Sequence, residues 1–186
     1  MIRSPEYITC GGYKLETALD VFNISPKNFV CVDIGASRGG FTDCLLERGA
    51  KKVYGIDVGV DQLYSSTHKN KKGAEEKTDL RSLTLPEKSD LTMVDISYIS
   101  LTYILKDISN LTKDGGNIVL LIKPQFEVGK EHILKDGIVD AKYREEAIKK
   151  ICDYAFTLGL INKGITESPV KGIDGNIEFF AWFEKK

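Results

Sequence analysis

Asp95 and Lys123 are the two residues whose type and position point most directly to chemistry. Each ends a short apolar run rich in β-branched residues, Ser89–Asp95 and Gly115–Lys123, and such runs predict central strands that are covered on both faces. Open α/β sheets bind ligands at the carboxyl ends of their strands. A lysine and a carboxylate placed there can hold or move a proton, although the same two residues could form a purely structural ion pair.

Two further charged residues occupy positions that need an explanation. Glu178 shares the alternating face of Phe180 and Trp182, and a carboxylate on an apolar face is costly unless it is paired. Lys14 lies at the start of a predicted helix, where an exposed lysine is the ordinary interpretation. Pro124 directly follows Lys123 and predicts a fixed turn that would hold the lysine in place.

The segment Asp33–Gly40, with the sequence DIGASRGG, predicts a ligand-binding turn between a strand and a helix. Its glycines follow a G-x-x-x-G spacing, and Ser37 replaces the second glycine of a dinucleotide-binding loop. A carboxylate at the strand end would repel a pyrophosphate but could meet a cationic ligand, and S-adenosylmethionine carries an ammonium and a sulfonium. We therefore expect this cofactor to be bound by Asp33, Gly35, Ala36, Ser37, Gly39, Gly40 and Phe41.

A second group of acids extends the predicted cofactor site. Asp57 ends a predicted strand 22 residues after Gly35, and an acid at about this spacing suits the hydroxyls of a ribose. The structural alternative is a helix N-cap. Asp79 lies near the end of a weaker predicted strand and could reach the adenine edge, or could be an exposed turn acid. The full set predicted to complete the site is Asp57, Val58, Asp79, Leu80 and Asp95.

Apolar runs alternate with amphipathic stretches along the chain, which predicts an α/β fold with a mostly parallel sheet. A first strand is expected over Phe29–Ile34, and two further strands, Leu160–Glu167 and Asn176–Phe183, flank a turn-rich segment and predict a closing antiparallel hairpin. Helical spacing of apolar residues predicts four helices, over Lys14–Phe22, Gly39–Arg48, Ser100–Leu111 and Ala141–Leu158.

The bulk composition is that of one globular domain in 186 residues, with 42% hydrophobic and 28% charged residues. No apolar run approaches a membrane span, and the amino terminus lacks the apolar core of a signal peptide. The four cysteines show no metal-binding spacing, so no metal is expected, and Cys31 and Cys44 should be buried hydrophobes. These features predict a cytoplasmic protein. The net charge of −1 argues weakly against nucleic-acid binding.

Five segments of the chain together resemble the TlyA (hemolysin A) branch of the FtsJ-like ribosomal RNA methyltransferases. These are GGYKLETAL, DIGASRGGFTDCLLERGAKKVYGIDVG, VDISYISL, LLIKPQFEVG and GNIEFFAWF. The resemblance implies a Rossmann-like methyltransferase fold, with a seven-stranded, mostly parallel sheet, an antiparallel carboxyl-terminal strand and helices on both faces. It also implies methylation of a ribose 2′-hydroxyl, that of a cytidine in 16S or 23S ribosomal RNA, by a Lys-Asp-Lys-Glu tetrad: Lys14, Asp95, Lys123 and Glu178.

The resemblance also bears on partners and domain organisation. Ribosomal RNA or ribosomal subunits are the expected partners. Relatives usually carry an S4-type RNA-binding domain before this region, so residues 1–186 are expected to be a single methyltransferase domain with that module absent or trimmed. Three other functions stay open: a small-molecule methyltransferase with an enclosed apolar pocket, a membrane-active haemolysin-type protein, and an RNA-binding domain that has kept the fold without catalysis.

The tetrad makes physical sense for transfer to a ribose hydroxyl, which must lose its proton as it attacks the methyl carbon. Lys123 could accept that proton if burial and the neighbouring Lys14 favour the neutral amine. It could instead orient a lone pair of the hydroxyl oxygen. In both cases Asp95 and Glu178 would orient the two lysines and balance their charge.

Overall fold

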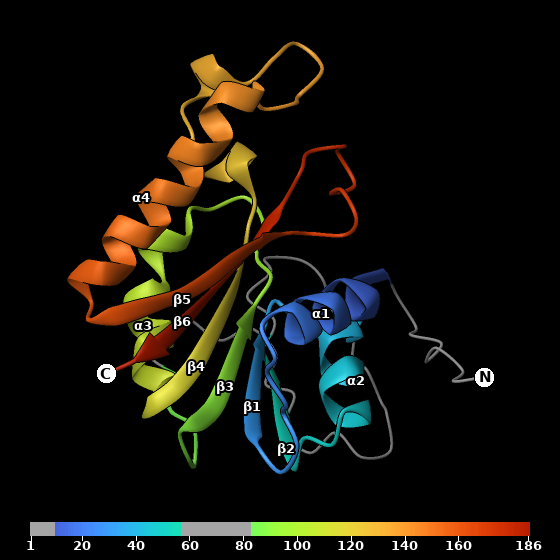
Figure 1. Ribbon diagram of the computed structural model, residues 1–186, viewed down its shortest axis with the longest axis vertical. Helices are drawn as coiled ribbons and strands as arrows, with labels where there is room; N and C mark the ends of the chain where they lie inside the picture. Colours follow the sequence, from blue (N-terminus) through green and yellow to red (C-terminus); the bar gives the residue numbers. More distant parts are fainter. Residues whose placement is uncertain (1–9, 57–82) are drawn as a thin grey trace.

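The computed structural model describes residues 10–56 and 83–186, which form a layered α/β structure (Figure 1). Its strands run in the order β2-β1-β3-β4-β6-β5 across one sheet. The strands are β1 (Val30–Ile34), β2 (Lys52–Ile56), β3 (Ser89–Val94), β4 (Thr112–Ile122), β5 (Leu160–Glu167) and β6 (Phe179–Lys185). The α-helices are α1 (Cys10–Val21), α2 (Gly40–Glu47), α3 (Leu105–Leu111) and α4 (Arg144–Thr157).

The sheet is mostly parallel. Strands β2, β1, β3 and β4 pair in parallel, and β6 runs antiparallel to both of its neighbours, β4 and β5. The predicted α/β class and the predicted terminal hairpin are therefore confirmed. The weak strand predicted near Asp79 lies outside the described residues, so a seventh strand stays a prediction. Asp57, Val58 and Leu80 lie outside them too.

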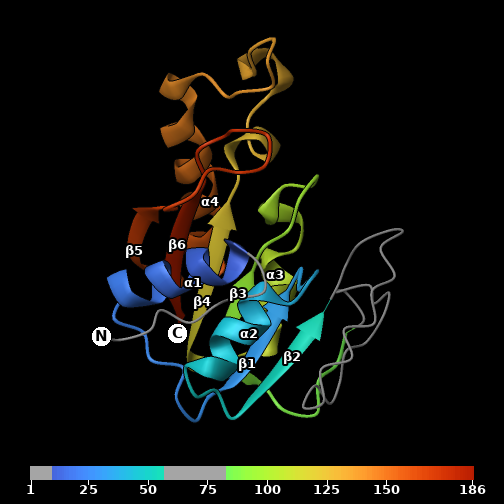
Figure 2. The same ribbon diagram turned by 90° about the vertical axis from the view of Figure 1, so that its right-hand side faces the viewer.

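Helices cover both faces of the sheet, as predicted. Figures 1 and 2 show α1 and α2 on one face and α3 and α4 on the other. Alternation along β1 explains this, because Val30, Val32 and Ile34 pack on the α3–α4 side while Cys31 packs on the α1–α2 side. Cys31 and Cys44 are fully buried, as expected, and burial raises the pKa of the Cys31 thiol to about 12.

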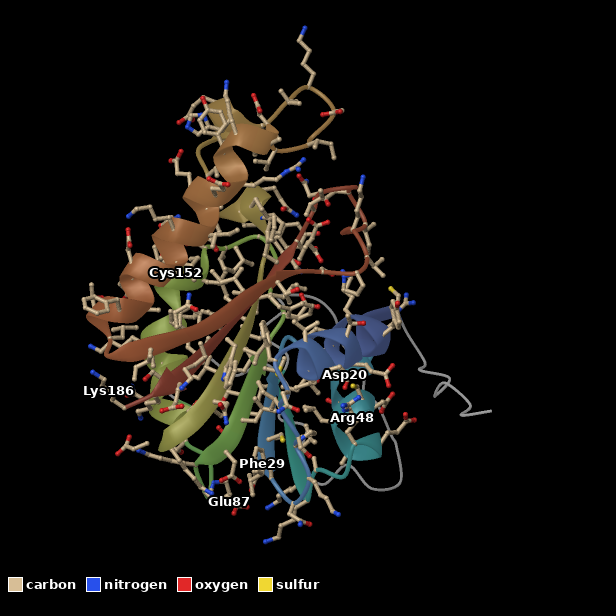
Figure 3. The ribbon with its side chains drawn as sticks, viewed as in Figure 1. Asp20, Phe29, Arg48, Glu87, Cys152 and Lys186 are labelled. Carbon is tan, nitrogen blue, oxygen red and sulfur yellow. The ribbon has the colours of Figure 1, made fainter. Side chains whose placement is uncertain are left out.

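Helix α1 begins at Cys10, four residues before its predicted start. Two consecutive glycines weaken a helix, so the sequence favoured a later start. Tertiary packing outweighs that preference, because Gly12 is buried in the helix. Arg48, just after α2, pairs with Asp20 of α1 and lies 3.6 Å from Glu16 (Figure 3). These ion pairs tie the later turns of α1 to the end of α2.

The other predicted helices differ in detail. The helix expected over Ser100–Leu111 is divided at Ile104 into a 3₁₀ turn, Leu101–Tyr103, and α3. Ser100 causes the early turn, because its hydroxyl accepts a hydrogen bond from the Thr102 amide. A 3₁₀ turn, 141–143, likewise precedes α4. None of the helices in the described ranges is long and apolar enough to cross a membrane.

Strand β6 begins at Phe179, later than predicted, so Glu178 precedes the strand. Phe179 pairs with Ile122, the last residue of β4, so the pairing with β4 cannot extend further back. The side chain of Asn176 instead accepts a hydrogen bond from the Val139 amide and donates one to the Gly137 carbonyl. The predicted alternation still holds, because Phe180 and Trp182 both pack on the α1–α2 side.

Candidate active site

Three predicted site residues directly follow three parallel strands. Gly35 follows β1, Asp95 follows β3 and Lys123 follows β4. Because these strands are parallel neighbours in the order β1-β3-β4, their carboxyl ends meet at one edge of the sheet. The structure therefore brings together residues that the sequence placed at separate strand ends.

Lys123 contacts two groups of the loop after β3. Its Nζ lies 2.7 Å from Asp95 Oδ1 and donates a hydrogen bond of 2.8 Å to Ser97 Oγ. The next residues, Pro124–Phe126, form a 3₁₀ turn in which the Phe126 amide bonds the Lys123 carbonyl. The predicted fixed turn is confirmed. Lys123 is therefore held at both its backbone and its ammonium group.

Lys14 and Glu178 form a second ion pair, with Nζ 2.6 Å from Oε2. Both side chains are buried, so the ordinary interpretation of Lys14 as an exposed helix lysine is wrong. Burial raises the pKa of Glu178, while the hydrogen bond and charge of Lys14 lower it; Lys123 also lowers it and Asp95 raises it. The pKa of the Glu178 carboxyl is raised overall, with burial as the largest cause.

The glycine loop packs directly against the Asp95 backbone. Gly35 has φ of +85°, and a Cβ built there would lie 2.0 Å from the Asp95 carbonyl oxygen. The Gly35 and Ala36 amides both donate to the Ile56 carbonyl at the end of β2. Gly39 also has a positive φ, just before α2, and Ser37 adopts φ of +43°, a conformation that is uncommon without glycine. The loop is thus fixed in a tight turn.

Asp33 lies within β1 and is fully buried. Its Oδ2 accepts a hydrogen bond of 2.5 Å from Thr42 Oγ1, which ties the strand to the first turn of α2. Asp33 does not line the cavity described next. Its predicted contact with a cofactor stays a prediction, and its observed contact helps to shape the glycine loop.

A cavity of about 750 Å³ opens at this edge of the sheet and joins the two predicted sets of residues. This volume lies in the range of small-molecule and cofactor sites. All four tetrad residues line it, namely Lys14, Asp95, Lys123 and Glu178. The predicted cofactor residues that line it are Gly35, Ala36, Ser37, Gly40 and Phe41. Gly39 is buried and does not line it.

Several cavity residues escaped the sequence analysis. Tyr98 is exposed at φ of +73°, and its ring lies 5.4 Å from that of Phe126. Gln125 donates a hydrogen bond of 2.8 Å to Asp174. Tyr98, Gln125 and Phe126 lie within three residues of Asp95 or Lys123, so that proximity was the available signal. The remaining residues that were missed are Cys10, Gly11, Arg38, Ser97, Ile173 and Asp174.

The model of the FtsJ-like methyltransferase family matches residues 7–185 of the chain. The 16S/23S rRNA (cytidine-2′-O)-methyltransferase TlyA of Mycobacterium tuberculosis is 38% identical over 182 residues, covering 95% of the chain and 68% of that protein. YqxC of Bacillus subtilis, named as a candidate rRNA methyltransferase, is 40% identical over 179 residues; the match covers 93% of the chain and 64% of that relative's length.

Solved structures agree with the sequence comparison. The structure of a candidate hemolysin from Lactococcus lactis has a TM-score of 0.90 and 37% identity, over 98% of this chain and 90% of that one. S-adenosylmethionine-dependent methyltransferases of 15–16% identity share the fold, with TM-scores of 0.67. The family match covers nearly the whole chain, and the four residues of the predicted tetrad line one cavity. The chain belongs to the FtsJ-like methyltransferase family.

Proposed function

We propose that this chain transfers a methyl group from S-adenosylmethionine to a ribose 2′-hydroxyl of ribosomal RNA, that of a cytidine. The observation that carries the proposal is the meeting of two lysine–carboxylate pairs, Lys14–Glu178 and Lys123–Asp95, in the cavity lined by the glycine loop. The name of the Mycobacterium tuberculosis relative supports the choice of RNA and hydroxyl.

The glycine loop fits the proposed cofactor. A Cβ at position 35 would overlap the Asp95 carbonyl, so only glycine lets the loop approach the end of β3. Ala36, Ser37 and Gly40 then form the cavity wall beside the first turn of α2. When bound, S-adenosylmethionine supplies a methyl group already activated by its sulfonium leaving group. We assign Asp57 to the ribose hydroxyls of the cofactor, since it directly follows the last residue of β2.

Lys123 is the residue that acts on the ribose hydroxyl in this proposal. An ammonium has three donors. In the described part of the chain Ser97 Oγ accepts a hydrogen bond of 2.8 Å from Lys123 Nζ, and Asp95 Oδ1 lies 2.7 Å from Nζ as its ion-pair partner. The remaining direction is available to a ribose oxygen. Lys123 thereby either orients that oxygen or, as the neutral amine, accepts its proton. Asp95 fixes Lys123, and Lys14 held by Glu178 adds a second positive charge for an oxygen that gains negative charge.

The charged side chains of the cavity favour this function over a small-molecule methyltransferase. An enclosed apolar pocket would suit a small apolar acceptor, whereas this cavity is open and lined by two lysine–carboxylate pairs. Lysines can also attract the phosphates that flank a ribose in RNA. The observations therefore support a polar acceptor within a nucleic acid.

The direct test is transfer of a tritiated methyl group to total ribosomal RNA and to purified small and large ribosomal subunits. We expect label in RNA, within dinucleotides that resist alkaline hydrolysis, because a 2′-O-methyl group blocks cleavage of the neighbouring phosphodiester. Label in alkali-sensitive nucleotides would place the methyl group on a base and contradict the proposed acceptor. No label in any RNA substrate would contradict the function.

A further inference from the structure

Glu127 is a buried carboxylate in the loop that begins at Lys123, after β4. Its side chain contacts the loop that begins at Asp95, after β3. It lies four residues after Lys123 and only 6% of it is exposed. Its Oε2 accepts a hydrogen bond of 2.5 Å from Ser100 Oγ, and its Oε1 accepts one of 2.8 Å from the Leu101 amide. Ser100 and Leu101 belong to the loop that begins at Asp95. One side chain of the loop after β4 therefore binds the loop after β3 at two points.

Helix α4 supplies the cation for this buried carboxylate. Lys150 Nζ lies 3.2 Å from Glu127 Oε2 and donates a 2.8 Å hydrogen bond to the Glu127 carbonyl. A buried carboxylate is costly unless donors and a counter-charge satisfy it, and here a hydroxyl, an amide and an ammonium do so. Both loops are thereby tied to α4, which packs on the sheet face away from α1 and α2.

The two loops thus meet at two levels. At the cavity, Lys123 contacts Asp95 and Ser97; behind it, Glu127 contacts Ser100 and Leu101. A shift of one loop against the other would change the 2.7 Å separation of the Lys123 and Asp95 side chains. We propose that Glu127 is a positioning residue that sets this separation and hence the direction in which Lys123 meets its substrate. The reaction it serves is the proposed function, but the geometric role stands apart from it.

The chain contains a matched control at the opposite end of the same two strands. Asp90, near the start of β3, accepts a 2.8 Å hydrogen bond from the Val30 amide and pairs with Lys113 of β4 at 2.6 Å. Like Glu127, it is a carboxylate that joins a backbone amide to a lysine. Asp90→Asn therefore removes the same kinds of contact without touching the cavity.

The kinetic test compares Glu127→Gln, Asp90→Asn and the unmodified chain in single-turnover methyl transfer. We expect Glu127→Gln to lower the rate about 10- to 100-fold, the cost of a misplaced catalytic group, with affinity for S-adenosylhomocysteine changed less than about twofold. Asp90→Asn should keep the rate even where its melting temperature falls as much. Ser100→Ala should give a smaller loss that is not additive with Glu127→Gln. Equal rates for Glu127→Gln and Asp90→Asn would overturn the proposal.

A second measurement does not depend on activity. In ¹⁵N-labelled protein, Glu127→Gln should move the amide resonances of Ser97 and Lys123 while leaving that of Lys14 in place, and Asp90→Asn should move none of the three. If Glu127→Gln does not fold, Ser100→Ala carries the same expectation with one contact removed. Unmoved Ser97 and Lys123 resonances would reject the positioning role. Failure of the proposed function would appear separately, as an unmodified chain that labels no RNA.

Discussion

Lys14 and Glu178, 164 positions apart in sequence, form a buried ion pair with Nζ and Oε2 2.6 Å apart. The pair joins the first turns of α1 to the residue just before β6, and it lines the same cavity as the Lys123–Asp95 pair. Removing one partner would leave the other as an uncompensated buried charge, which is costly. This arrangement makes the stability of the fold and the charge of the cavity depend on the same two residues.

The pH dependence of stability should reveal Glu178. Because burial raises the pKa of its carboxyl, its contribution to stability is fully present below the pKa of the unfolded chain and is lost as the pH rises through the higher folded value. The melting temperature of the unmodified chain should therefore fall relative to that of Glu178→Gln as the pH rises above about 4, the ordinary range of a glutamate.

Glu87 supplies a control of opposite sign. A hydrogen bond from Lys52 is the main cause that lowers the pKa of its carboxyl. The contribution of Glu87 to stability is therefore present above the pKa of the unfolded chain and is lost as the pH falls. The unmodified chain should gain stability relative to Glu87→Gln as the pH rises, with a shallow slope because the side chain is exposed. Parallel slopes for the two variants would contradict the assignment of Glu178.

Gly35→Ala should be far more costly than Gly115→Ala. Both glycines have a positive φ, but nothing lies within 4 Å of a Cβ at Gly115, whereas a Cβ at Gly35 would overlap the Asp95 carbonyl. Backbone strain alone should cost Gly115→Ala about 1–2 kcal/mol of unfolding free energy. Gly35→Ala should exceed about 3 kcal/mol. Denaturant titration measures both, and equal losses would show that the close approach of the loop to β3 is not needed.

Asp57 is proposed to bind the ribose of the cofactor. Ile56, the residue before it, accepts hydrogen bonds from Gly35 and Ala36 at the glycine loop. Asp57→Ala should weaken binding of S-adenosylmethionine by about 1–3 kcal/mol, the value of hydrogen bonds to a charged group. Calorimetric titration measures this, with Asp153→Ala, an exposed acid of α4, as the control. Unchanged affinity in Asp57→Ala would reject the assignment.

The residues that the sequence predicted well are those fixed by strand ends. Gly35, Asp95 and Lys123 each follow a recognisable apolar run, and parallel strands deliver such residues to one edge whatever the loops do. Pairings between distant segments could not be predicted from the sequence. Residue type and spacing alone do not show that Lys14 meets Glu178, or that Glu127 meets Ser100 between two loops. The family resemblance supplied the tetrad, and only the packed helices and sheet show which members pair.

Helix boundaries were also harder to predict than strand ends, for local physical reasons. Gly11 and Gly12 argued against the first turn of α1, yet packing holds it in helical form. The stretch after Ser100 has helical spacing throughout, but the hydroxyl of Ser100 caps a separate 3₁₀ turn before α3 begins. Packing of the helix decided the first boundary, and a side-chain hydrogen bond to the backbone decided the second.

The central claim is that Lys123 acts on the ribose hydroxyl, and its most direct test again uses both ends of β3 and β4. Lys123 pairs with Asp95 at the carboxyl ends, and Lys113 pairs with Asp90 at the amino ends. Single-turnover methylation of ribosomal RNA should fall about 10²–10⁴-fold in Lys123→Ala and stay near that of the unmodified chain in Lys113→Ala. Lys123→Arg should not restore the rate, because a guanidinium cannot give up its proton to act as a base and has a different shape. Near-normal methylation by Lys123→Ala, with cofactor binding and melting temperature intact, would contradict the account.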